Sequence, residues 1–151
     1  SVLKKIFILL IFLYGHLYAL ERKSTLKMYH SIFAALSQKT LINVYTRDEE
    51  YRDVFKHSKK IFLSDKLEEA DIVLVTEEKA LNKVLYRVNI ESGRKPIIFV
   101  TNYHFLKISN KIVGAFYWRK GRSQLLFIKS RLNEHNITLP KEYQNFIIDA
   151  L

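Results

Sequence analysis

Two short runs of apolar residues constrain the fold of this chain most strongly. Residues 72–75 read Ile-Val-Leu-Val and residues 97–100 read Ile-Ile-Phe-Val, without a polar position in either run. A strand that is apolar at every position needs cover on both faces, which is typical of a parallel sheet between two layers of helices. These runs therefore predict an α/β fold.

The segments around these runs alternate between strand and helix patterns. Apolar residues at helical spacing predict helices over residues 26–36, 48–55 and 77–88, and short apolar runs predict further strands over residues 41–45 and 61–63. We expect Ser24 or Thr25 to cap the first helix and Thr46 or Asp48 to cap the second. Acidic residues at the helix starts are expected to complement the helix dipole. This alternation is typical of a parallel sheet with helical crossovers.

The last third of the chain has a different pattern. Residues 112–117 and 123–128 predict two strands around a tight turn, for which Gly121 supplies the permissive backbone. Pro140 suits the first turn of a last helix, which would run to Leu151. Together the patterns predict one three-layer α/β domain, with a mostly parallel sheet flanked by helices and an antiparallel hairpin at its C-terminal edge.

The N-terminal residues have the order of parts found in an export signal. Two lysines precede an apolar run over residues 6–14, and Ala19 follows at a plausible cleavage point. We therefore expect residues 1–19 to be a signal peptide and residues 20–151 to form a single periplasmic domain. The alternative is an uncleaved segment that tethers the domain to the inner membrane, because Leu17 is larger than the small residue usual at that position.

Composition limits the partners and the chemistry of the exported domain. Two of the 25 basic side chains lie in the signal segment, and the remaining 23 stand against 15 acidic ones, a net charge of +8. The chain has no cysteine, which excludes thiolate nucleophiles, thiolate metal ligands and disulfides. Export also removes nucleic acid as an expected partner, although the positive charge would suit it.

Motifs for catalysis, cofactors and metals are missing from the sequence. It contains no glycine-rich phosphate-binding loop and no G-x-S-x-G nucleophile motif. The histidines are scattered, and no two have the i, i+3 or i, i+4 spacing of one helix face. Adjacent glutamate pairs point to different sides of a helix, so they indicate solvated surface. We predict a protein that is not an enzyme, with no catalytic residue, cofactor or metal site.

Basic residues concentrate between Gly93 and Asn133, a segment without any acidic residue. They are Arg94, Lys95, Lys107, Lys111, Arg119, Lys120, Arg122, Lys129 and Arg131. Because strand side chains alternate, one of Tyr117 and Trp118 should be exposed beside this charge. Such a field suits an acidic protein, anionic lipid headgroups or an anionic ligand, and the alternative is ordinary surface charge on a lysine-rich protein. Aromatic and arginine side chains are common interface anchors, so the candidate interaction surface comprises Trp118, Arg119, Lys120, Arg122, Lys129 and Arg131.

A series of short segments carries a family resemblance. They are residues 42–46, 70–75, 94–100, 114–116 (Gly-Ala-Phe), 120–122 (Lys-Gly-Arg), 126–128 (Leu-Phe-Ile) and 136–140 (Asn-Ile-Thr-Leu-Pro). Their order, over roughly residues 28–147, resembles the YfiR-like family of bacterial periplasmic proteins. The chain departs from the family pattern at Lys129, where asparagine is usual, in its last helix, and in lacking the disulfides of some members. The resemblance implies an exported α/β domain, and better-known members bind and inhibit the periplasmic part of a membrane signalling enzyme.

These observations leave more than one function open. The first expectation is a non-enzymatic periplasmic binding or regulatory protein that docks on the external domain of a membrane signalling protein. The alternatives are a structural subunit of an envelope assembly, such as a flagellar motor scaffold, and a periplasmic protein that binds a small ligand. Self-association is also open, whereas membrane contact is expected only if the signal segment stays uncleaved.

Overall fold

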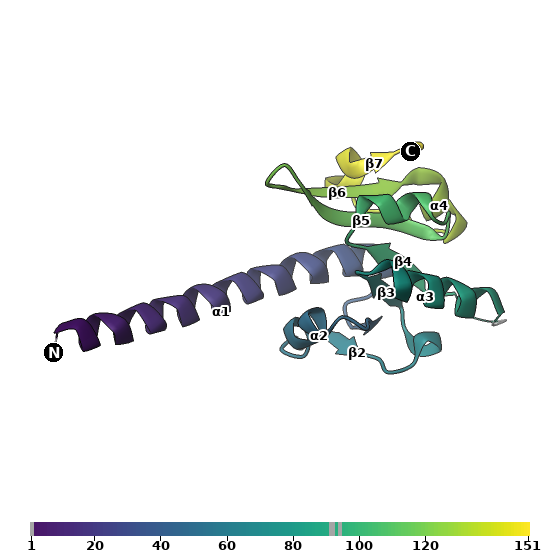
Figure 1. The fold of residues 1–151 in the computed structure, drawn as a ribbon. Coiled ribbons are helices and arrows are strands. Elements are labelled where there is room, and N and C mark those ends of the chain that lie inside the picture. Colours follow the sequence, from purple (N-terminus) through teal and green to yellow (C-terminus); the bar gives the residue numbers. More distant parts are fainter. Residues whose placement is uncertain (1, 91–92, 94) are drawn as a thin grey trace.

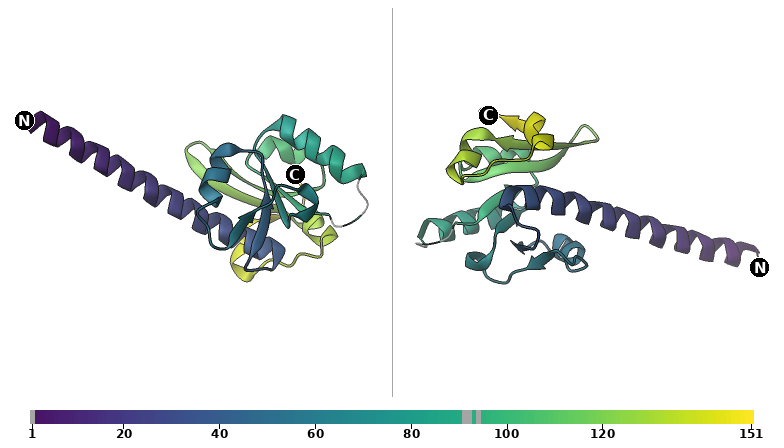
Figure 2. Two further views of the ribbon diagram at one scale, coloured as in Figure 1. Left: turned by 90° about the horizontal axis from the view of Figure 1, so that it is seen from below. Right: turned by 180° about the vertical axis from the view of Figure 1, so that it is seen from behind.

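One sheet and one long helix organise the molecule. The computed structural model describes residues 2–90, 93 and 95–151, without the side chains of residues 11–20 (Figure 1). The helix α1 (Val2–Ser37) runs without interruption from the N-terminal end into the domain, and Figure 2 shows its first half extending well beyond the sheet. The side chain at the expected cleavage point, Ala19, lies outside the described part of α1, so the signal peptide stays a prediction.

The described strands form one seven-stranded sheet in the order β2-β1-β3-β4-β5-β6-β7. The strands are β1 (Ile42–Tyr45), β2 (Ile61–Leu63), β3 (Ile72–Val75), β4 (Ile97–Val100), β5 (Ile112–Arg119), β6 (Arg122–Ile128) and β7 (Ile147–Ile148). Pairing is parallel from β2 to β5, antiparallel between β5 and β6, and parallel again between β6 and β7. The predicted α/β class, with a mostly parallel sheet and an antiparallel hairpin, is confirmed.

The helical segments cover both faces of the sheet, which makes three layers. They are α2 (Glu49–Phe55), α3 (Glu78–Ile90), α4 (Lys129–Glu134) and the 3-10 helices η1 (Leu67–Glu69), η2 (Tyr103–Lys107) and η3 (Lys141–Phe146). In β3, Ile72 and Leu74 join the core under α1 and α2, whereas Val73 and Val75 join the core under α3 and η2. Alternate residues of one strand thus fill two separate cores, which explains why the run has no polar position.

The prediction that Ser24 or Thr25 caps the first helix is wrong. Both residues lie inside α1, and the Thr25 hydroxyl donates to the carbonyl of Glu21 one turn earlier (2.9 Å). Neither proline nor a polar loop separates the apolar run from the domain helix, so helical hydrogen bonding continues through Ser24. The second cap is confirmed as Asp48, whose carboxylate accepts from the backbone amides of the first turn of α2.

The prediction of a last helix from Pro140 to Leu151 is also wrong. Pro140 precedes the 3-10 helix η3, and the chain then becomes the short strand β7. Ile147 pairs with Phe127 on β6, so this segment satisfies a strand edge that a helix would leave unpaired. Three other short helical elements, η1, η2 and α4, were not predicted by the sequence pattern, and α4 follows β6 directly.

The hairpin contains two positions with special backbone requirements. Lys120 (φ 51°) and Gly121 (φ 76°) form its two-residue turn, with positive φ at both positions as in a type I′ turn. The second position is Gly114, near the start of β5, where an added Cβ atom would overlap the carbonyl oxygen of Leu126 on β6. Glycine at position 114 therefore allows the close approach of the two strands.

Candidate functional site

The turn of the hairpin gathers most of the predicted interaction surface. We call Trp118, Arg119, Lys120, Gly121 and Arg122 the hairpin tip. Trp118 is 72% exposed and Tyr117 is partly buried, which confirms the predicted alternation. The basic side chains of the tip are exposed as well. The tip therefore presents one large aromatic side chain and three positive charges to the surroundings.

The charges of the hairpin tip have no internal compensation. Arg119 and Arg122 face each other directly across the β5–β6 pair. Like charges at directly opposed positions destabilise an antiparallel pair. None of the tip cations forms an ion pair with the described residues, whose ion pairs all lie elsewhere. Water and salt screen part of this repulsion, and a bound anionic group would reduce it further.

Trp118 stands between two hollows of the surface. One, of about 520 Å³, lies where β4 and β5 end and is lined by Thr101, Asn102, Tyr103, His104, Tyr117, Trp118 and Arg119. The other, of about 370 Å³, lies between α1, α2 and the hairpin and is lined by Glu21, Arg22, Thr25, Glu50, Tyr51, Val54 and Trp118. In the first hollow, the rings of Tyr103 and Tyr117 pack with centroids 5.4 Å apart. The indole is therefore flanked by space that a partner side chain can fill.

The structure does not bring Lys129 and Arg131 to the hairpin tip. Strand β6 separates them from it, and its seven residues span roughly 20 Å. The Arg131 guanidinium donates to the carbonyls of Leu106 (2.9 Å), Ser109 (3.0 Å) and Ile112 (3.0 Å), and its burial lowers the pKa of this group. Arg131 thus holds the loop after η2 in place, and Lys129 begins α4 at the end of β6 that lies away from the turn.

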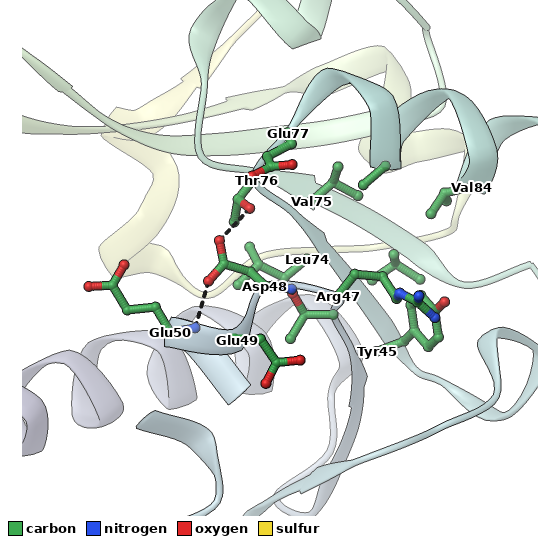
Figure 3. Close-up of a pocket in the computed structure, with 13 residues that line it drawn as sticks. Tyr45, Arg47, Asp48, Glu49, Glu50, Leu74, Val75, Thr76, Glu77 and Val84 are labelled. Carbon is green, nitrogen blue, oxygen red and sulfur yellow. Dashed lines mark hydrogen bonds between the residues drawn. The ribbon is translucent and has the colours of Figure 1, made fainter. Parts of the chain in front are cut away.

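A second candidate site lies at the carboxyl ends of β1 and β3. There the chain leaves β1 into α2 on one face and leaves β3 into α3 on the other face, so the order of the strands reverses at this point. In open α/β sheets, small ligands bind in the crevice that such a reversal leaves. A cavity of about 340 Å³ occupies this crevice (Figure 3).

The central polar group of this crevice, the Asp48 carboxylate, forms hydrogen bonds within the domain. One Asp48 carboxylate oxygen accepts from the Thr76 hydroxyl (2.6 Å), and the other accepts from the amides of Glu50 (2.9 Å) and Tyr51 (3.1 Å) (Figure 3). These bonds tie the loop after β1 to the loop after β3. Asp48 is therefore a structural acceptor rather than a free general base, which sharpens the expected helix-capping role.

The rim of the crevice carries further polar and charged side chains. Arg47, Glu49 and Glu77 line it with both signs of charge, while Val73 and Val84 supply apolar wall. Within the described residues, no group of three or more histidine, aspartate or glutamate side chains gathers in a way that could hold a metal ion. Sequence reasoning missed this crevice, although both polar loops directly follow apolar strands and so had to meet at one sheet edge.

Burial shifts the pKa values of several groups, among them Tyr51, which lines the hollow beside Trp118 and whose pKa is raised. Burial raises the pKa of Tyr29, whose hydroxyl donates to the hydroxyl of Tyr51 (3.3 Å) in the core under α1. Burial lowers the pKa of His135, near the end of α4. Such shifts often mark catalytic sites, but here they follow from packing alone.

Comparisons with known proteins do not assign a function to either candidate site. Among the described residues, no helix is both long and apolar enough to cross a membrane. Comparison with family models, curated proteins and solved structures finds no match to this chain.

Proposed function

We propose that this chain is a non-enzymatic binding protein that docks through its hairpin tip on an acidic surface, and that this surface belongs to the external domain of a membrane signalling protein. One observation carries the proposal. Trp118 is 72% exposed next to Arg119, Lys120 and Arg122, which have no ion-pair partner among the described residues. The resemblance to the YfiR-like family supports the periplasmic setting and the regulatory role.

The physical argument starts from what each tip residue contributes to an interface. Tryptophan and arginine are enriched among the residues that dominate binding energy, and truncation of such residues costs roughly 2 kcal/mol or more. Arg119 and Arg122 are directly opposed on β5 and β6, and each guanidinium can form a bidentate pair with a carboxylate of a partner. Binding would also remove the repulsion between these two arginines. Binding of an acidic partner would thus be favoured both by its attraction to the two arginines and by the smaller repulsion between them.

The charge distribution favours the tip over the rest of the surface. Acidic side chains gather between Asp48 and Glu78, on α2, η1 and the start of α3, whereas the hairpin has none. An acidic partner is therefore attracted to the hairpin more than to α2, η1 or the start of α3, although Glu21 and Glu50 line the hollow beside Trp118. Such steering increases the rate of association and weakens as salt is added.

The decisive experiment uses charge reversal at the tip. The tagged chain is used to capture partners from solubilised envelope, and the captured membrane protein is then titrated against wild type and against Arg119→Glu with Arg122→Glu. A matched control is Lys59→Glu with Lys60→Glu, because these exposed lysines lie in the loop before β2, far from the hairpin. We expect affinity to fall at least tenfold in the tip variant and to stay within twofold in the control.

Other outcomes of the same experiment discriminate the alternatives. Equal binding by the tip variant would remove the hairpin from the interface. Capture of many subunits in fixed stoichiometry would support the envelope scaffold instead. Trp118→Ala in an otherwise unchanged tip separates the aromatic contribution from the charge, and loss of affinity with unchanged salt dependence is the expected signature.

The crevice between β1 and β3 supports a second candidate function, the binding of a small polar ligand. Its location at the reversal of strand order favours this function. A screen of amino acids and nucleotides by thermal unfolding tests it, since a ligand that binds only the folded state raises the melting temperature. The increase should disappear in Arg47→Ala, and no increase with any ligand counts against the site.

A further inference from the structure

The first residues of α1 form an apolar surface that the domain does not cover. We call residues 2–10 the apolar arm. Its large apolar side chains are 49–80% exposed: Val2, Leu3, Ile6, Phe7, Ile8, Leu9 and Leu10. Figures 1 and 2 show the arm extending away from the sheet in every view. An exposed apolar surface of this extent marks a contact with another molecule or with lipid.

The distribution of these side chains identifies the covering material. Five consecutive apolar residues, 6–10, point to all sides of the helix, so this part of the arm has no polar face. A protein groove or a partner helix covers one stripe of a helix and would leave the other side in water. The acyl chains of a bilayer cover a helix on all sides, so lipid is the occupant that fits.

Basic residues on either side of the apolar stretch indicate which lipids it would meet. Lys4 and Lys5 lie within the arm, and Lys23 and Lys27 are exposed on α1 close to the domain. Long lysine side chains can keep their ammonium groups at the lipid headgroups while their stems contact acyl chains. Each lysine near an anionic surface contributes to binding, so anionic headgroups are favoured.

The same helix fixes the orientation of the domain. Tyr29, Phe33 and Leu36 of α1 lie in the core, so the arm is the outer end of a helix whose other end is packed in the domain. Trp118 shares a hollow with Glu21 of α1, which places the hairpin tip beside the part of α1 that leaves the domain. In Figures 1 and 2 the tip and the arm extend from the domain in the same direction.

We infer that α1 is retained, that the apolar arm inserts into a bilayer with anionic headgroups, and that the hairpin tip lies on the side of the domain nearer the membrane, where the external domain of a membrane protein is also found. Retention is part of the inference, because cleavage after Ala19 would remove the whole arm. The inference does not depend on the docking partner. It requires the arm to enter the lipid layer, but it does not require α1 to cross the bilayer.

The test uses vesicles and single labels. The chain has no cysteine, so Phe7→Cys, Lys120→Cys and Ser130→Cys each give one labelling site, in the arm, at the tip and on α4. The labelled full-length protein is mixed with vesicles of phosphatidylcholine alone or with phosphatidylglycerol, each containing quenchers at a known depth. We expect quenching by acyl-chain quenchers at position 7, quenching by headgroup quenchers only at position 120, and none at position 130.

Variants and alternative outcomes make the inference refutable. Ile8→Lys with Leu10→Lys keeps the core intact and should weaken vesicle binding at least tenfold, with an unchanged circular dichroism spectrum. Equal binding to neutral and anionic vesicles would overturn the assigned headgroups, and equal quenching at positions 120 and 130 would overturn the orientation. Absence of vesicle binding together with concentration-dependent association would assign the arm to a second copy of the chain. An intact mass of the envelope protein that lacks residues 1–19 would overturn retention.

Discussion

Replacing Lys120 by asparagine should stabilise the fold and weaken docking at the same time. Lys120 has φ 51°, in the left-handed region, and it precedes Gly121 with φ 76°. A non-glycine residue in this region is strained by about 1 kcal/mol or more, and asparagine tolerates it better than lysine. Lys120→Asn also removes one of three neighbouring positive charges. Relief of the backbone strain should therefore contribute roughly 0.5–1 kcal/mol to the free energy of unfolding.

This gain is measurable by thermal unfolding. For a chain of this size, about 1 kcal/mol corresponds to an increase in melting temperature of roughly 2–4 °C. Affinity for the acidic partner should fall in parallel, because the substitution removes a charge at the centre of the tip. Lys120→Gly should give the same two effects, since it relieves the same strain and removes the same charge.

Gln38 provides a matched control for the backbone effect. It follows α1 with φ 57°, far from the tip, and its amide donates to the carbonyl of Ala34 (2.8 Å). Gln38→Gly should raise the melting temperature by a similar amount and leave binding unchanged. A decrease in stability of Lys120→Asn would refute the strain argument. An increase without any loss of affinity would show that Lys120 has no part in docking.

Three further substitutions test the packing and the electrostatics of the domain. Gly114→Ala should destabilise it by about 1–3 kcal/mol in urea unfolding, because the new methyl group meets the Leu126 carbonyl and separates the hairpin strands. Asp71→Ala should lower the free energy of unfolding by about 1–3 kcal/mol in the same assay, because the buried carboxylate accepts a hydrogen bond from the backbone N–H of Asn43 (2.9 Å). Burial lowers the pKa of His135 in the folded chain, so the unfolded chain takes up a proton at a higher pH than the folded chain does. The free energy of unfolding should therefore fall as the pH drops below about 6.5, and it should level off below the pKa of the folded state. His135→Gln should flatten this part of a melting-temperature profile measured between pH 8 and 5, and an unchanged slope would assign the effect to other groups.

The strands were predictable because their burial on both faces requires short runs of consecutive apolar residues, which are visible in the local sequence. Residues 72–75 and 97–100 are apolar throughout, and the structure covers them on both faces. The order of the strands depends instead on contacts between distant segments, which no local pattern encodes. The segment after Pro140 shows the same limit. Its apolar residues fit a helix in isolation, but the free edge of β6 pairs with Ile147 and Ile148.

The candidate surface was predictable where its residues are neighbours in a hairpin. Trp118, Arg119, Lys120 and Arg122 lie within one turn, so their proximity follows from the turn alone. Lys129 and Arg131 lie beyond a full strand, and a strand carries its ends apart. A run of like charges in sequence is therefore evidence for one surface only within the length of a turn.

The combination of residues at the hairpin tip favours the proposed docking surface over ordinary surface charge. Ordinary lysine-rich surface would place its charges where the fold tolerates them. Here a lysine occupies a left-handed position, two arginines oppose each other across the strands, and a tryptophan is left 72% exposed. Each choice has a more stable alternative for a hairpin: asparagine in the turn, an opposite charge across the strands, and a smaller side chain at the exposed position. Their coincidence within five residues is difficult to attribute to folding, and it is the arrangement that binding of an anionic partner would maintain.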